Sequence, residues 1–123
     1  MSKTIDDKLA RFINNQEDVK SLRNRIKRLQ SKVRQTETRL AELKANKEKF
    51  AEFEHSIIPR ERQLYRDIEV EIVIRESDLV NAKAVLWLTE NDLANLIALY
   101  RAQAAVPETK KLAERVFGEE MEK

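Results

Sequence analysis

Apolar residues recur every seven positions through the first half of the chain. Two sets lie three residues apart, which is the a and d pattern of a coiled coil. The first set is Ile5, Phe12, Val19, Ile26, Val33 and Leu40, and the second is Leu22, Leu29, Leu43, Phe50 and Ile57. Good helix formers separate them, with neither Gly nor Pro before residue 59. We therefore expect a helix over about residues 4–55 whose narrow apolar stripe contacts one main partner helix.

The stretch DIEVEIVIRESDLV, residues 67–80, allows two interpretations. Its alternating β-branched residues are typical of a strand, and a β-hairpin through residues 68–74 and 82–88 would account for them. A second heptad series nevertheless passes through the same stretch: Tyr65, Ile72, Leu79, Leu86, Leu93 and Tyr100. A strand would interrupt that register and resume it in phase. We therefore predict a second helix over about residues 59–105.

Pro59 stands between the two predicted helices. Proline is unfavourable inside a helix and well suited to its first position, so a turn is expected over about residues 56–59. Two helices joined in this way would pair antiparallel, with residue i facing roughly residue 115 minus i. This register stacks Leu43 on Ile72 and Phe50 on Tyr65. A parallel dimer of the first helix is the competing arrangement.

Charged residues beside the seams test the same register. It sets Arg39 beside Asp78 and Lys44 beside Glu69, which are favourable pairs in an antiparallel coiled coil. It also sets Arg25 beside Asp92, Arg23 beside Glu90, and the like-charged Glu37 beside Glu76. Favourable pairs outnumber the repulsive one, so the antiparallel hairpin is the preferred arrangement.

Three polar residues occupy seam positions in this register: Thr36, Lys47 and Arg75. Long basic side chains at such positions commonly bury their aliphatic stems and extend the charged group to water. A polar seam residue also disfavours slipped pairings at some cost in stability. Both interpretations remain open for Arg75, which the register places opposite Leu40.

The second helix carries more apolar residues than one partner helix can cover. Those lying away from the seam are Val70, Val73, Ile74, Val80, Trp87 and Leu88. A short C-terminal helix after Pro107, in residues 107–123 with their acidic end, would cover only part of this face. We therefore predict an all-α fold in which residues 1–106 form a long antiparallel coiled-coil hairpin. The hairpin is expected to form a homodimer, or a larger oligomer, as a four-helix bundle.

Composition excludes most catalytic chemistry. The 123 residues include 37% charged residues, one Gly, two Pro, one His and no Cys. We find no thiol, glycine-rich phosphate loop or serine nucleophile motif, so we expect neither an enzyme nor a cofactor. Glu52 and His55 form a Glu-x-x-His pair, but a metal site would need several further ligands. We expect no metal there.

Localisation and partners follow from charge and hydropathy. No apolar run approaches the roughly 20 residues that span a bilayer, and the first residues lack the core of a signal peptide. A cytoplasmic protein that does not bind membranes is expected. Between residues 20 and 34 there are seven basic residues and no acidic one, and those predicted to face outward are Lys20, Lys27, Arg28 and Arg34. We expect a non-enzymatic adaptor or scaffold that binds itself and another protein. Binding of nucleic-acid backbone through these four residues is the alternative.

Overall fold

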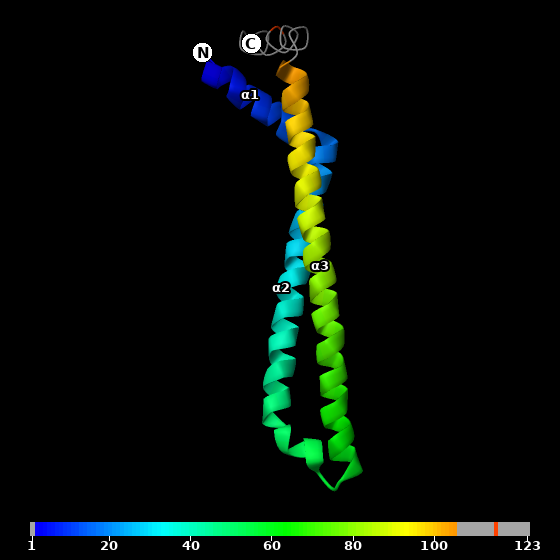
Figure 1. Ribbon diagram of the computed structural model, residues 1–123. Coiled ribbons are helices and arrows are strands. Elements are labelled where there is room, and N and C mark those ends of the chain that lie inside the picture. Colours follow the sequence, from blue (N-terminus) through cyan, green and yellow to red (C-terminus); the bar gives the residue numbers. More distant parts are fainter. Residues whose placement is uncertain (1, 106–114, 116–123) are drawn as a thin grey trace. The chain divides into compact units, whose positions relative to one another are not determined.

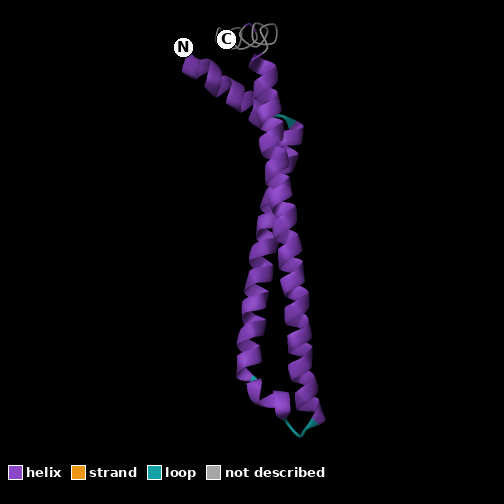
Figure 2. Ribbon diagram, viewed as in Figure 1, coloured by secondary structure: helices purple, strands orange, loops and turns teal. Residues whose placement is uncertain are grey.

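The computed structural model describes residues 2–105 and residue 115, and the ordered elements in this part of the chain are helical (Figure 2). They are α1 (Ser2–Asn14), α2 (Glu17–Lys49), the 3-10 helix η1 (Ala51–His55) and α3 (Pro59–Ala105). The predicted all-helical class is confirmed, and α3 replaces the alternative β-hairpin through residues 68–74 and 82–88. The C-terminal helix predicted over residues 107–123 lies outside the described residues, apart from residue 115.

The chain divides into two compact units. The terminal unit consists of residues 1–26 and 88–123, and the central unit is Lys27–Trp87. The terminal unit therefore contains α1, the start of α2 and the end of α3. The central unit contains the rest of α2 and α3 together with η1.

The expected continuous helix over residues 4–55 is wrong, because the chain leaves the helical path between α1 and α2. The amide of Asn15 donates to the carbonyl of Arg11 at 3.0 Å, and the amide of Gln16 then donates to the carbonyl of Ile13 at 3.1 Å. The break follows two consecutive asparagines, Asn14 and Asn15, a residue type whose side chain can hydrogen-bond nearby backbone groups in non-helical conformations and which therefore disfavours a helix. α2 then begins with two acidic residues in its first turn, where the helix dipole favours negative charge.

The break changes which residue of α1 is buried. Ile13 is 2% exposed, whereas its neighbour Phe12 is 47% exposed. A heptad counted through an unbroken helix places Phe12 in the seam. The turn at residues 15–16 interrupts that count, so the seam prediction for Phe12 is wrong.

The terminal unit also contains polar contacts between segments distant in the sequence. The hydroxyl of Tyr100, in α3, donates to the carboxylate of Asp18, in α2, with oxygen–oxygen distances of 2.9 and 3.1 Å. Val19, next to Asp18, is fully buried. Arg23 donates to the side-chain oxygen of Asn14 at 2.9 Å, and so links α2 to the end of α1.

Pro59 is the first residue of α3, and Ser56 forms several hydrogen bonds in the turn before it. The amide of Ile58 donates to the hydroxyl oxygen of Ser56 at 3.1 Å, and that hydroxyl donates to the carboxylate of Glu61 at 2.6 Å. Arg62 donates to the carbonyl of Ser56 at 2.7 Å. These bonds satisfy backbone groups left unpaired at the ends of helices. Ile57 is 92% exposed in this turn, which corrects its predicted seam position.

In the central unit α2 and α3 lie side by side and run in opposite directions (Figure 1). Their buried apolar cluster consists of Leu40 and Leu43 from α2 and Ile68 and Ile72 from α3. Partly buried Phe50 and Leu79 pack against it. Leu43 and Ile72, which the predicted register pairs, thus belong to one cluster.

The ion pairs of the central unit have partners different from the predicted ones. Arg39 pairs with Glu71 at 3.0 Å instead of Asp78, and Lys44 pairs with Glu76 at 3.6 Å instead of Glu69. Each charged position faces two positions of the antiparallel helix, one heptad apart, so the register alone does not choose between them.

Arg75 lies beside both acidic residues in question, 3.5 Å from Asp78 and 3.9 Å from Glu71. Glu71 therefore contacts both Arg39 and Arg75. The hydrogen bond from Arg39 to Glu71 is the main reason that the pKa of Arg39 is raised above its ordinary value. Glu37 and Glu76, which the predicted register sets side by side, each pair with a lysine: Glu37 with Lys83 at 3.8 Å and Glu76 with Lys44 at 3.6 Å.

The three polar seam residues lie in different environments. Thr36 donates its hydroxyl hydrogen to the carbonyl of Lys32 at 2.8 Å, and the ammonium of Lys47 lies 5.9 Å from the ring centre of Tyr65. The guanidinium of Arg75 lies beside Glu71 and Asp78, but its Nε is buried without a hydrogen-bond partner. The guanidinium of Arg75 thus has one buried, unpaired nitrogen, while its two terminal nitrogens lie near carboxylates.

Candidate interaction surfaces

α3 has an apolar face that the described residues leave exposed. Its six residues, here called the outer face, have exposed fractions between 51% and 67%: Val70, Val73, Ile74, Val80, Trp87 and Leu88. Five lie in the central unit, and Leu88 is the first residue of α3 in the terminal unit. All six are exposed in the single chain.

The positions of these residues around the axis of α3 explain why α2 does not cover the outer face. At about 100° per residue, Val73 and Val80 lie on the side of α3 opposite the buried Ile68 and Ile72. Between Val70 and Trp87 the remaining positions on that side of the helix are the exposed and uncharged Ser77, Asn81 and Ala84. Ser77 and Ala84 were not predicted to lie on this face. Their seven-residue spacing from Val70 is the signal that would have included them.

The four outward basic residues are also exposed, but their surroundings are ordinary for a solvated helix. Lys20 belongs to the terminal unit, and Lys27, Arg28 and Arg34 belong to the central unit. Arg23, predicted to pair with Glu90, donates instead to Asn14. No aromatic side chain lies between Lys20 and Arg34 in the sequence, so the helix lacks the stacking residues typical of single-strand binding.

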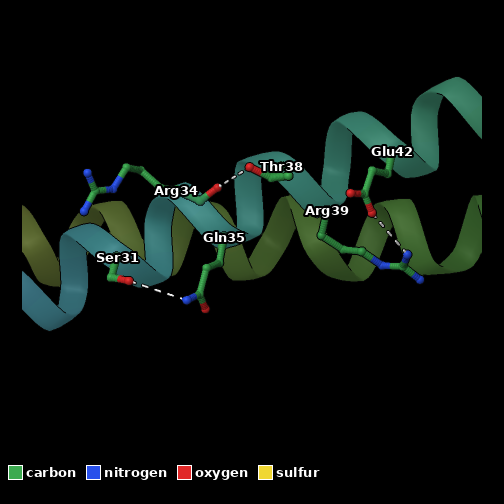
Figure 3. Close-up of a pocket in the computed structure, with 6 residues that line it drawn as sticks. All are labelled: Ser31, Arg34, Gln35, Thr38, Arg39 and Glu42. Atoms are coloured by element: carbon green, nitrogen blue, oxygen red, sulfur yellow. Dashed lines mark hydrogen bonds and ion pairs between the residues drawn. The ribbon is translucent and has the colours of Figure 1, made fainter.

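A shallow depression follows α2 in the central unit (Figure 3). All its lining residues come from this one helix: Ser31, Arg34, Gln35, Thr38, Arg39 and Glu42. Their polar groups contact one another within the helix: Thr38 donates to the carbonyl of Arg34 at 3.0 Å, and Arg39 pairs with Glu42 at 3.6 Å. A depression on one helix has no opposing wall, so it does not enclose a ligand.

The Glu-x-x-His pair lies in η1, beside the turn. His55 is exposed, and its Nε2 lies 3.9 Å from Glu54. Among the described residues, no group of three or more His, Cys, Asp or Glu side chains is arranged to hold a metal ion. No described helix is long and apolar enough to cross a membrane.

No protein-family model, curated protein or solved structure matches the chain. Since no relative indicates a function, we infer one from the outer face.

Proposed function

We propose that the protein is a non-enzymatic coiled-coil adaptor or scaffold that acts by binding a second copy of itself and other proteins. The observation that carries this proposal is the outer face. Its six large apolar side chains are more than half exposed on a helix that already buries its opposite side against α2. An extended apolar surface of this kind is typical of an interaction site.

The proposed architecture is an antiparallel coiled-coil hairpin that dimerises into a four-helix bundle. α3 would lie in the centre, between α2 of its own chain and the second copy, while the basic α2 helices lie outside. The apolar cluster of Leu40, Leu43, Ile68 and Ile72 supports the pairing of α2 with α3. The exposed outer face supports the addition of a second copy.

Replacing Trp87 and Leu88 together by Glu tests this proposal. Each carboxylate would oppose burial at an interface far more than folding, because both positions are already exposed in one chain. Sedimentation velocity at micromolar concentration should show a dimer or larger oligomer for the wild type and a smaller species for the double variant. Circular dichroism should show that most of the helix remains.

The matched control is the double change Ile57→Glu and Ile58→Glu. These two residues are adjacent, apolar and exposed, but they lie in the turn and outside the outer face. This control variant should have the same oligomeric state as the wild type. A monomeric wild type would refute the proposal, and an oligomer that survives Trp87→Glu with Leu88→Glu would place the interface on another surface.

Binding to nucleic-acid backbone is a second candidate, supported by the exposed Lys20, Lys27, Arg28 and Arg34. Contacts of this kind weaken with salt in proportion to the number of phosphates neutralised. If they form, the triple change of Lys27, Arg28 and Arg34 to Gln should lower affinity for labelled duplex DNA. It should also reduce the salt slope by roughly three times 0.9. No binding by the wild type at physiological salt would eliminate this candidate.

A further inference from the structure

The outer face has a heptad repeat of its own. In the central unit Val70, Ser77 and Ala84 recur every seven residues, and Val73, Val80 and Trp87 follow each of them by three. This is an a and d pattern, separate from the one that faces α2. All six positions are exposed. They are called the outer seam below, and α3 therefore has two coiled-coil seams on opposite sides.

The sizes of the side chains in the outer seam distinguish two orientations of a partner helix. Two parallel copies would set Ala84 against Ala84 and Ser77 against Ser77, leaving little side-chain volume in those layers, and would crowd Trp87 against Trp87. Two antiparallel copies would instead set Ala84 against Val73, Ser77 against Val80 and Trp87 against Val70. Alternation of large with small side chains fills such an interface better.

The antiparallel orientation also provides a favourable charge pair beside the outer seam. Glu76 and Lys83 flank the outer seam, and their side chains are 51% and 58% exposed. In the antiparallel arrangement Glu76 of each copy lies beside Lys83 of the other. Glu76 already pairs with Lys44, and Lys83 with Glu37, so the contact would join two existing ion pairs into a row of alternating charge. The parallel arrangement provides no such pair.

One kind of flanking contact opposes this arrangement. The same register sets Glu69 beside Glu90 of the second copy, and by the two-fold symmetry this like-charged pair occurs twice, as often as the favourable pair of Glu76 with Lys83. The like-charged pairs lie at the two ends of the outer seam, whereas the favourable pairs lie nearer the two-fold axis. Exposed pairs of either kind contribute little, so the fit of large against small side chains is the main argument for the orientation.

We propose that the outer seam binds the outer seam of a second copy in antiparallel orientation, with Ala84 against Val73 and Trp87 against Val70. This inference rests on the proposed self-association and adds its orientation and register. A two-fold axis would then cross α3 between Ser77 and Val80. The partner it identifies is α3 of a second copy of this chain.

Cysteine cross-linking tests the orientation directly, because the chain contains no native Cys. The single variants Val73→Cys and Ala84→Cys should each remain uncross-linked under mild oxidation. In the antiparallel arrangement the two copies of either position are separated by about 17 Å along the axis, more than the roughly 7 Å that a disulfide spans. A mixture of the two variants should form a covalent dimer.

Every other result contradicts the inference, and each one has a different explanation. Covalent dimers in the separate variants would indicate a parallel pairing. If no sample is cross-linked although sedimentation still shows a dimer that Trp87→Glu with Leu88→Glu disrupts, the antiparallel register is wrong and the proposed function stands. A monomeric wild type would refute both proposals.

Discussion

The hydroxyl of Tyr100 contacts both carboxylate oxygens of Asp18, at 3.1 and 2.9 Å, although the two residues are 82 positions apart in the sequence. The contact joins the end of α3 to the start of α2 within the terminal unit. Because the phenol donates to a carboxylate, ionisation of the phenol would replace a hydrogen bond by repulsion. This bond is the main cause of the raised pKa of Tyr100.

A titration of Tyr100 should reveal this contact. In a Tyr65→Phe background Tyr100 is the remaining tyrosine, so the ultraviolet absorbance of phenolate reports on it alone. We expect a pKa above the ordinary value of 10.0 in the folded protein, returning toward 10.0 in denaturant. Adding Asp18→Ala should remove most of the increase. A pKa at or below 10.0 in the folded protein would contradict the hydrogen bond.

The same shift predicts how stability changes with pH. The pKa is higher in the folded state, so the contribution of Tyr100 is fully present below the unfolded pKa and is lost as pH rises through the folded value. Unfolding in guanidinium should therefore show stability falling in that alkaline range. Tyr100→Phe should flatten the fall relative to the wild type. An unchanged dependence would mean that other groups cause it.

Alanine substitutions at Ile13 and Phe12 should test the break between α1 and α2. Ile13 is 2% exposed, so Ile13→Ala should lower the free energy of unfolding by about 2–5 kcal/mol. Phe12 is 47% exposed, and Phe12→Ala should cost much less despite removing a larger side chain. Chemical denaturation of both variants at one protein concentration measures the difference. The opposite order would support a helix that continues through residues 15 and 16.

Arg75→Leu should raise the melting temperature by a few degrees. The buried Nε of Arg75 has no hydrogen-bond partner, and leaving such a group unpaired costs roughly 1–3 kcal/mol. Its ion pairs to Asp78 and Glu71, at 3.5 and 3.9 Å, are exposed to solvent and offset little of that cost. Thermal unfolding followed by circular dichroism gives the comparison.

Arg28→Leu is the matched control for Arg75→Leu, because Arg28 is exposed on α2 in the same unit. It removes a guanidinium without releasing a buried polar atom and should change the melting temperature little. A marked fall in stability for Arg75→Leu alone would show that the pairs with Glu71 and Asp78 outweigh the unpaired Nε.

Much of the helical pattern was predictable because it depends on spacing along the chain. Seven-residue recurrence predicted α3 through a stretch whose alternating β-branched residues also suit a strand. Pro59 marked its beginning, since proline fixes the backbone angle of a first helical residue and lacks the amide that would be unpaired there. The outer face was predictable for the same reason, since residues opposite a seam on one helix follow from its period.

The heptad pattern gave wrong predictions where two local conformations, or two possible ion-pair partners, differ little in free energy. Asn14 and Asn15 disfavour a helix only slightly, so recurrence alone did not reveal the break, and Phe12 was assigned the place that Ile13 occupies. Likewise Arg39 had two acidic positions within reach, Asp78 and Glu71. Sequence spacing cannot rank them, because the choice depends on how the side chains pack between the helices, where Arg75 also lies beside both acids.

The sequence by itself determined that the described chain is helical, where α3 begins and ends, and which of its residues lie opposite the buried seam. The helical class and the residues opposite the seam follow from a helical period that is the same in every protein, and the beginning of α3 follows from Pro59. Only the tertiary structure decided that Ile13 is buried in place of Phe12, that Tyr100 meets Asp18 and that Arg39 meets Glu71. Such contacts join segments distant in the sequence, and their selection depends on the packing and competing partners around each side chain.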